Sequence, residues 1–197
     1  MSDHFPVNLV LRERSCLVVG AGRVALRKTE QLLVAGASVT VVAPSVVGGF
    51  DDLPVEVIRR EFAVADLDGR RLVITATGDR VVDQMIFDEC ERRGIWINSA
   101  DDPQRCSFTL PATIRRGDLL VTFSTAGSSP GLSSWLRRRF EGLIDERFAA
   151  VVDDLAAERR RIHELGESTE NLDWTPLIER ALVRHGVNLP EEMEVGS

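Results

Sequence analysis

The stretch that decides the fold is Ser15-Cys-Leu-Val-Val-Gly-Ala-Gly-Arg-Val-Ala25. Its apolar start is typical of a short buried strand, and the glycines then turn the chain into a helix. Gly20 permits the tight turn, Gly22 lets the backbone approach a pyrophosphate, and Ala25 lets the helix pack close to the strand. The free N–H groups at the helix start would face the phosphates. The stretch therefore predicts a dinucleotide-binding turn, and the alternative is a turn that needs glycine only for packing.

Strands and helices alternate through the first half of the chain. The strand segments are rich in β-branched residues, as in parallel sheets. In the first helix, we expect the apolar residues Val24, Leu32 and Leu33 to share one side. We expect strands over residues 15–20, 38–43, 55–58, 71–76 and 95–98, and helices over 24–35 and 81–93. This alternation predicts an α/β protein with a Rossmann-type parallel sheet.

The pattern changes near residue 107. Ser129 and Pro130 fit the N-cap and first turn of a long helix. A polar loop is expected before the last helix. We expect strands over 107–114 and 119–124, a Ser/Gly-rich loop over 125–131, helical structure to about 165, a loop over 166–175 and a helix to His185. The second half is therefore expected to be a strand pair followed by helices.

Composition excludes several classes of protein. Hydrophobic residues make up 44% and charged residues 28%, as in ordinary globular proteins. No apolar run is long enough to span a membrane, and the N-terminus lacks a signal-peptide pattern. The three cysteines are widely spaced, without a Cys-x-x-Cys pair, which argues against disulfides and a cysteine zinc site. We therefore expect a cytoplasmic protein with no metal ligands and no membrane partner.

Positive charge is concentrated in the middle of the chain. Residues 114–147 carry six basic and four acidic side chains, within a chain of net charge −7. The overall negative charge argues against a nucleic-acid partner. The local positive charge would attract an anionic small molecule, and the alternative is a solvated helix face.

Missing residue types argue against two common dehydrogenase chemistries, the Tyr/Lys chemistry of short-chain dehydrogenases and the His-based chemistry of 2-hydroxy-acid dehydrogenases. The chain has no tyrosine, and its three histidines lie outside the alternating core. A carboxylate is then the most available general base, and Asp101 and Asp102 directly follow the fifth strand. Ligands of open α/β sheets bind at that edge, so either aspartate is placed to accept a proton as a hydride leaves. The alternative is a simple turn, because Asp-Asp-Pro is also good turn chemistry.

The end of the second strand bears on the choice of cofactor. An acidic residue commonly binds the ribose 2′-hydroxyl there, but this chain has Pro44 and Ser45. Ser45 can hydrogen-bond the ribose, and no arginine stands at that point of the sequence to accept a 2′-phosphate. The sequence therefore favours NAD over NADP.

Several motifs together resemble those of the siroheme synthase dehydrogenase/ferrochelatase family. They occur in the family's order and cover roughly residues 4–165. The motifs are Leu17 to Ala25, Arg27-Lys28, Ala35 to Ala37, Ala76 to Asp79, Asn98 to Pro103 leading into Ser107-Phe108, and Ser124 to Pro130. The chain looks like a precorrin-2 dehydrogenase. The resemblance implies NAD-dependent oxidation of precorrin-2 to sirohydrochlorin in siroheme biosynthesis.

The resemblance also implies roles and a domain organisation. The family's catalytic aspartate falls on Asp101. We expect a homodimer with a Rossmann domain over 1–113, a dimerisation segment over 114–147 and a helical domain over 148–197. Expected cofactor residues are Gly20, Gly22, Arg23, Val24, Ala43, Pro44, Ser45, Thr75, Ala76 and Thr77, and expected substrate residues are Asn98, Ser124, Thr125, Gly127, Ser128 and Arg137.

The positive middle segment fits that substrate, because the macrocycle bears eight carboxylates and arginine binds carboxylates well. The candidate side chains are Arg115, Arg116, Arg137, Arg138 and Arg139. An opposing interpretation places the arginines behind a dimer-interface stripe formed by Trp135, Leu136, Phe140, Leu143 and Ile144.

Two other functions stay open from the sequence. A bifunctional enzyme would also insert ferrous iron into sirohydrochlorin, with Asp101 helping to remove pyrrole protons. A non-enzymatic NAD-sensing module would use the same glycine turn without turnover.

Overall fold

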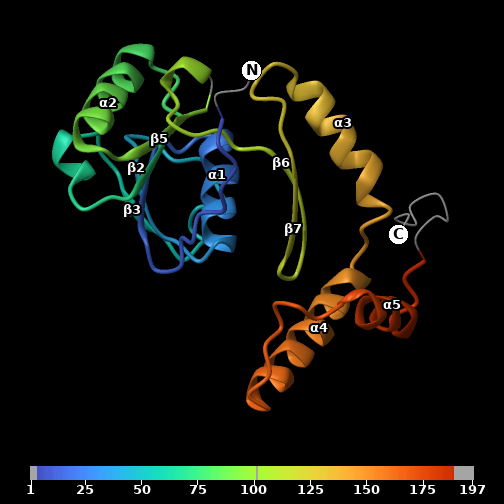
Figure 1. Ribbon diagram of the computed structural model, residues 1–197. Coiled ribbons are helices and arrows are strands. Elements are labelled where there is room, and N and C mark those ends of the chain that lie inside the picture. Colours follow the sequence, from blue (N-terminus) through green and yellow to red (C-terminus); the bar gives the residue numbers. More distant parts are fainter. Residues whose placement is uncertain (1–3, 101, 189–197) are drawn as a thin grey trace. The chain divides into compact units, whose positions relative to one another are not determined.

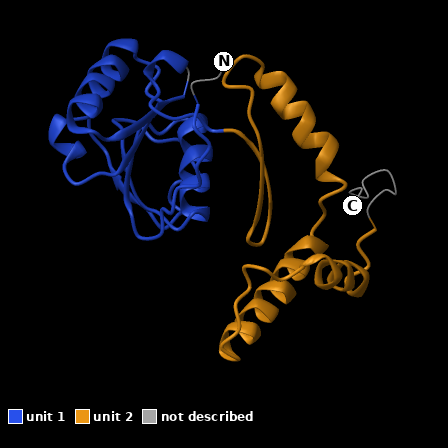
Figure 2. Ribbon diagram, in the orientation of Figure 1, with its two compact units in different colours: residues 1–110 blue, residues 111–197 orange. Residues whose placement is uncertain are grey.

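The computed structural model describes residues 4–100 and 102–188. The chain forms two compact units, residues 1–110 and residues 111–197 (Figure 2). Among the described residues, the first unit has two hydrophobic clusters and the second unit has one.

The first unit is a five-stranded parallel sheet in the order β3-β2-β1-β4-β5 (Figure 1). This is the strand order of the first five strands of a Rossmann fold, which confirms the predicted α/β architecture. The strands are β1 (Ser15–Val19), β2 (Ser38–Val42), β3 (Glu56–Ile58), β4 (Leu72–Thr75) and β5 (Trp96–Ser99). The helices are α1 (Arg23–Val34) and α2 (Arg80–Arg93), and the short 3-10 turns are η1 (Val64–Leu67) and η2 (Pro103–Arg105).

Both faces of the sheet are covered, because residues along each strand alternate between two hydrophobic clusters. Val18 and Ile74 belong to the cluster under α1, and Leu17 and Val73 to the cluster under α2. All four side chains are almost fully buried. This two-sided burial explains why the strands are continuous apolar runs rather than alternating ones.

Helix α1 rests on the sheet through Ala25, Thr29 and Leu32, which lie one turn apart along one face. Val24 was expected on the same side as Leu32, but Val24 is 38% exposed whereas Leu32 is 6% exposed. The reason is helical geometry: Val24 precedes Ala25 by one residue and so points about 100° away from the sheet. Val24 is therefore exposed at the helix start, where the expected cofactor contacts are.

The second unit begins with a strand pair, β6 (Ala112–Arg116) and β7 (Leu119–Phe123), which are antiparallel. Helices α3 (Pro130–Glu141), α4 (Arg147–Glu164) and α5 (Thr175–Arg184) follow. Phe140 of α3 packs on Phe123 of β7, with ring centroids 5.5 Å apart. Val151 of α4 and Ala181 of α5 share the cluster that joins the last two helices.

Two boundaries predicted for this half were wrong. The strand expected from residue 107 begins only at Ala112, because Ser107 and the residues around it bond back to β5 and Pro111 cannot donate to a ladder. The helical stretch expected to run to residue 165 is interrupted between Glu141 and Arg147, where Gly142 ends α3. The division into three functional parts stays a prediction.

Candidate functional site

The glycine turn joins β1 to α1 at the carboxyl edge of the sheet. Gly20 has a φ of +101°, which L side chains rarely adopt, and its N–H donates to the Val42 carbonyl at 2.9 Å. A Cβ on Gly20 would collide with the carbonyl group of Ala76, the residue after β4. Glycine is therefore required at position 20 for two reasons. The turn needs a positive φ, and the ends of β1, β2 and β4 lie too close together there for a side chain.

The second glycine has a different environment. Gly22 is the N-cap of α1, and a Cβ built there meets no atom within 4 Å. No side chain caps this helix start, and no acidic residue lies in its first turn. An uncapped N-terminus leaves backbone N–H groups for an anion, and the open space beside Gly22 fits a closely approaching pyrophosphate. The residues present therefore fit a dinucleotide.

The expected cofactor residues from three strand ends lie at one edge. Ala43 directly follows β2, and its N–H donates to the carbonyl of Ile58 at the end of β3. Ala76 follows β4 and donates to the Val19 carbonyl of β1 at 2.8 Å. Pro44 and Ser45 are exposed just beyond. The sheet thus brings together, at one edge, residues that the sequence predicted to bind a cofactor.

Two threonines at the end of β4 differ in their hydrogen bonding. Thr77 Oγ1 donates to the Asp83 carboxylate of α2 at 2.8 Å and is thereby fixed. Thr75 is fully buried, and its Oγ1 has no hydrogen-bond partner among the described residues. A buried hydroxyl without a partner is costly, so Thr75 carries an unsatisfied polar group just below the edge of the sheet.

Sequence reasoning missed two arginines beside the cofactor residues. Because Val42 of β2 pairs with Ile58 of β3, Arg59 and Arg60 leave the sheet next to Pro44. Arg60 is held by Asp66 in a bidentate ion pair and lowers the pKa of that carboxyl. Arg59 is more exposed, 3.5 Å from the Asp51 carboxylate. The preference for NAD was based on the absence of an arginine near Ser45 in the sequence. In the structure, the pairing of β2 with β3 brings Arg59 and Arg60 to that end of the sheet.

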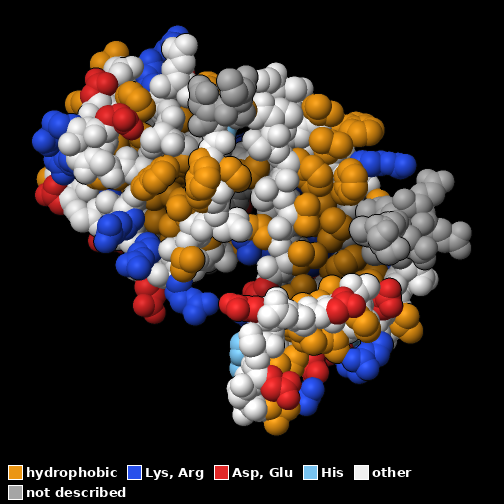
Figure 3. Space-filling model, in the orientation of Figure 1, with side chains coloured by type: hydrophobic (Ala, Val, Ile, Leu, Met, Phe, Trp, Pro, Cys, Tyr) orange, Lys and Arg blue, Asp and Glu red, His pale blue; other side chains and the backbone are white. Residues whose placement is uncertain are grey.

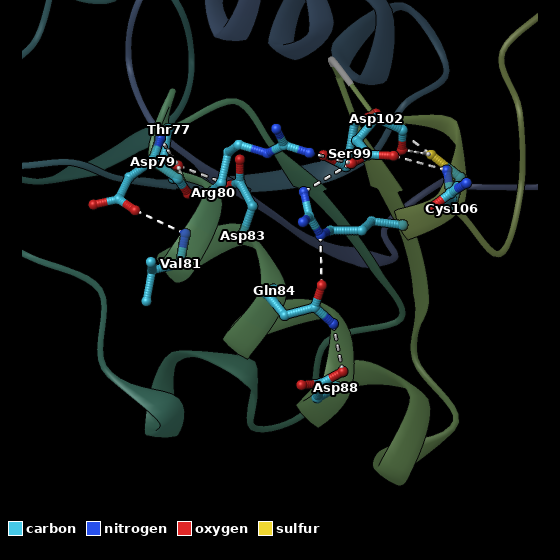
Figure 4. A network of polar contacts seen from close by, with 12 residues as sticks. Thr77, Asp79, Arg80, Val81, Asp83, Gln84, Asp88, Ser99, Asp102 and Cys106 are labelled. Carbon is cyan, nitrogen blue, oxygen red and sulfur yellow. Dashed lines mark hydrogen bonds and ion pairs between the residues drawn. The ribbon is translucent and has the colours of Figure 1, made fainter.

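The loop after β5 carries the predicted catalytic position. Asp101 itself lies outside the described residues. On one side of it, the Ala100 N–H donates to the Thr75 carbonyl at 2.9 Å. On the other side, Asp102 accepts hydrogen bonds from the Gln104 N–H at 3.0 Å and from Arg105 Nη1 at 2.9 Å (Figure 4). Asp102 therefore serves the turn, as the simpler interpretation of Asp-Asp-Pro expected.

The base of this loop is closed by Asn98 and Cys106. The buried amide of Asn98 donates to the Phe108 carbonyl at 3.0 Å and to Cys106 Sγ at 3.4 Å. Burial raises the pKa of the Cys106 thiol, so the group keeps its proton and donates to the Ser99 and Asp102 carbonyls. Asn98, an expected substrate residue, thus also holds the loop together.

The remaining expected substrate residues belong to the second unit. Ala126 and Gly127 both have positive φ, and the Ser128 N–H donates to the Thr125 carbonyl, which makes a tight turn of the I′ kind. Thr125 Oγ1 accepts a hydrogen bond from the Ser129 N–H at 2.9 Å. Ser124 is exposed beside this turn. The loop therefore presents its backbone immediately ahead of α3.

The arginines expected to hold carboxylates are not equivalent. Arg137 pairs with Glu141 at 2.7 Å, and Arg116 donates to the Ile144 carbonyl at 2.9 Å. These two side chains therefore hold local structure. Arg115, Arg138 and Arg139 are exposed. The exposed three are the better candidates for an anionic ligand.

Among residues 4–100 and 102–188, no group of three or more His, Cys, Asp or Glu side chains is arranged to hold a metal ion. No helix of this part is long and apolar enough to cross a membrane.

Comparison with known proteins agrees with this geometry. A family model described as putative NAD(P)-binding matches residues 7–112, more than half of the chain. The chain therefore belongs to this NAD(P)-binding family.

The chain is also similar to individual relatives and to a solved structure. Siroheme synthase of Methylococcus capsulatus is 40% identical over 166 residues, which are 82% of this chain and 35% of the relative. Siroheme synthase of Thioalkalivibrio sulfidiphilus is 42% identical over 158 residues, 77% of this chain and 32% of the relative. The solved structure of SirC, a precorrin-2 dehydrogenase, matches with a TM-score of 0.71 and 26% identity, covering 93% of this chain and 99% of SirC.

These likenesses confirm the family resemblance that the motifs indicated. The chain spans about a third of the length of the curated relatives it matches. SirC, by contrast, is matched over nearly its whole length, across both units of this chain.

Proposed function

We propose that this protein oxidises precorrin-2 to sirohydrochlorin with NAD as the hydride acceptor. The single observation that carries the proposal is the match to SirC, a precorrin-2 dehydrogenase, over 93% of the chain. The glycine turn and the loop after β5 support it, because they bring a fitting dinucleotide site and a carboxylate-bearing loop to one sheet edge.

The chain's own residues have distinct parts in this reaction. The N–H groups at the start of α1, beside Gly22, hold the pyrophosphate. A bound nicotinamide would supply the acceptor for the hydride that leaves the macrocycle. Asp101 accepts the proton that leaves with it, so that two hydrogens are removed in total. The exposed arginines of the second unit and the turn ahead of α3 bind substrate carboxylates.

We also propose NAD rather than NADP as the cofactor. Arg59 would favour a 2′-phosphate, but its guanidinium lies 3.5 Å from the Asp51 carboxylate. That carboxylate offsets the positive charge and disfavours a second anion at the same place. The Asp51–Arg59 pair, together with Ser45, therefore supports selection of NAD.

The decisive variant for the reaction is Asp101→Asn. It keeps the shape of the side chain and removes its capacity to accept a proton, so we expect turnover of precorrin-2 to fall by at least about 100-fold. NAD affinity, measured by calorimetry, should stay within about twofold of the wild type. Full turnover in Asp101→Asn would contradict the assignment of the base, whereas lack of turnover by the wild type would contradict the function itself.

A second activity is suggested by the name of the relatives, siroheme synthase. Iron insertion into sirohydrochlorin would make the protein bifunctional. The test is incubation of sirohydrochlorin with ferrous ions, where a rate above the protein-free control supports chelation. A rate equal to that control leaves the dehydrogenase reaction alone.

We further propose that the protein is a homodimer in the cytoplasm. Trp135 is 54% exposed on α3, and Leu132 and Leu143 are also exposed. Figure 3 shows hydrophobic side chains gathered over the part of the second unit that α3 occupies in Figure 1. Exposed apolar surface of this kind marks association sites. Light scattering should give twice the chain mass, and Trp135→Glu should give the monomer.

A further inference from the structure

The loop between β5 and β6 is braced from the outer side of α2 by a chain of polar contacts (Figure 4). We propose that Asp102, Arg105 and Gln84 form a positioning brace that fixes this loop for the hydride-transfer reaction. This inference rests on the proposed function, since the reaction it serves is the dehydrogenase step at the carboxyl edge.

The brace begins at the Asp102 carboxylate. Its Oδ1 accepts from the Gln104 N–H at 3.0 Å, and its Oδ2 lies 2.9 Å from Arg105 Nη1 and 3.7 Å from Arg80 Nη2. Only 21% of the Asp102 side chain is exposed. Both oxygens are thus engaged with donors, so this carboxylate holds structure rather than a substrate proton.

Arg105 carries the connection across to the helix. Its side chain is 15% exposed, and its Nε donates to Gln84 Oε1 at 2.7 Å. Gln84 Nε2 in turn donates to Asp88 Oδ1 at 2.8 Å. One guanidinium therefore binds the loop with one nitrogen and α2 with another, which fixes both distance and direction between them.

The opposite side of the loop is tied to the sheet. The Ala100 N–H bonds to the Thr75 carbonyl, and the Cys106 thiol donates to the carbonyls of Ser99 and Asp102. These contacts hold the loop's base to β4 and β5, but they do not reach α2. Among the described residues, Asp102 has two side-chain links to α2, and the one through Arg105 is the closer, because the pair of Asp102 with Arg80 is 3.7 Å long.

Such a brace contributes to a reaction by holding the loop after β5 in a fixed position. A displacement of about 1 Å at a reacting group costs about 100-fold in rate. The pyrophosphate-binding turn lies on β1 and α1 and shares none of these contacts. Loosening the brace should therefore lower kcat and leave NAD binding unchanged.

The test uses Arg105→Met, Gln84→Leu and their combination in the full-length chain. We expect each single change to lower kcat for precorrin-2 by roughly 10- to 100-fold, with the Kd for NAD within about twofold of the wild type. The double variant should lose little more than either single one, because both changes remove one interaction. Arg105→Lys, which keeps the charge, should recover part of the rate.

Arg92→Met is the matched control. Arg92 lines the same surface pocket beside α2 as Gln84 and Arg105. It donates hydrogen bonds to Glu89 on its own helix and not to the loop. The proposal predicts wild-type kcat for this variant. An unchanged kcat in Arg105→Met, an equal loss in Arg92→Met, or additive losses in the double variant would overturn it.

A second readout separates this inference from the proposed function. Hydrogen exchange of peptides covering residues 98–108 should speed up in Arg105→Met and Gln84→Leu, but not in Arg92→Met. Unchanged exchange in the two brace variants would overturn the brace whether or not precorrin-2 is turned over. Absence of turnover in the wild type would instead refute the proposed reaction.

Discussion

Substitution by alanine should affect a different property at each of the two glycines of the turn. Gly20→Ala places a methyl group against the backbone carbonyl of Ala76, at a φ of +101°. Gly22→Ala places a methyl group where no atom lies within 4 Å, at a φ of −82°. The first change is therefore a test of folding, and the second is a test of ligand binding.

The magnitudes follow from the local geometry. Strain of a non-glycine residue at such a φ costs roughly 1–3 kcal/mol, and forcing a methyl group into packed backbone costs roughly 1–3 kcal/mol more. We expect Gly20→Ala to lower the free energy of unfolding by about 4 kcal/mol, or the melting temperature by about 10 °C. Gly22→Ala should cost less than about 1 kcal/mol, since it loses only a favourable N-cap residue.

Urea unfolding followed by circular dichroism measures the first effect, and calorimetry with NAD measures the second. Gly22→Ala should weaken NAD binding at least tenfold, about 1.4 kcal/mol, because its methyl group occupies the space of the pyrophosphate. A Gly20→Ala protein as stable as the wild type, or a Gly22→Ala protein with unchanged NAD affinity, would refute the reasoning.

Three further predictions concern other parts of the first unit. Asp51→Asn should lower the ratio of the Kd for NADP to that for NAD at least fivefold, because Arg59 is then unopposed; an unchanged ratio in equilibrium titrations would exclude this pair from cofactor selection. Burial raises the pKa of Cys16 to about 11 and that of Cys90 to about 12, so neither thiol should react with a thiol reagent at pH 8 until the protein unfolds, and rapid modification of either would contradict the buried placement. The folded-state pKa of Asp66 is lowered by its arginine partner, so its contribution to stability is complete above about pH 4 and is lost as pH falls through the lowered value; Asp66→Asn should flatten the acid side of the stability profile, and an identical profile would argue against it.

The sheet could be predicted because short stretches of sequence are enough to indicate its strands. Strands β1, β2 and β4 are runs of four or five residues, mostly apolar and almost all buried. Asp79 is the N-cap of α2, with its carboxylate accepting from the N–H groups of Val81 and Val82. Local signals of this kind do not depend on distant parts of the chain, so they are visible in the sequence.

The errors arose where distant contacts decide the structure. Residues 107–111 have the composition of a strand, but Ser107 is bound to Ile97 of β5 instead of to a hairpin partner. Arg59 is 14 positions beyond Ser45, and only the pairing of β2 with β3 brings the two strand ends together. Sequence spacing does not reveal such pairings without the sheet order.

The residue types of the candidate site could be proposed from the sequence, but the contacts of each side chain could not. Chain position alone does not separate Asp101 from Asp102; the family resemblance places the catalytic role on Asp101, and the contacts of Asp102 with Arg105 and Gln104 tie Asp102 to the loop. The engagement of Arg137 by Glu141 was likewise not expected, although the two residues are four apart on α3. Side-chain pairing of this kind decides which charged groups remain for a ligand.

The central claim is oxidation of precorrin-2 by NAD, and its most direct measurement is the reaction itself. The protein is mixed with precorrin-2 and NAD under anaerobic conditions, and the absorbances of sirohydrochlorin and NADH are followed together. We predict one NADH formed for each sirohydrochlorin, at a rate that is at least about 100-fold lower in Asp101→Asn. Binding of NAD with no formation of either product would contradict the claim.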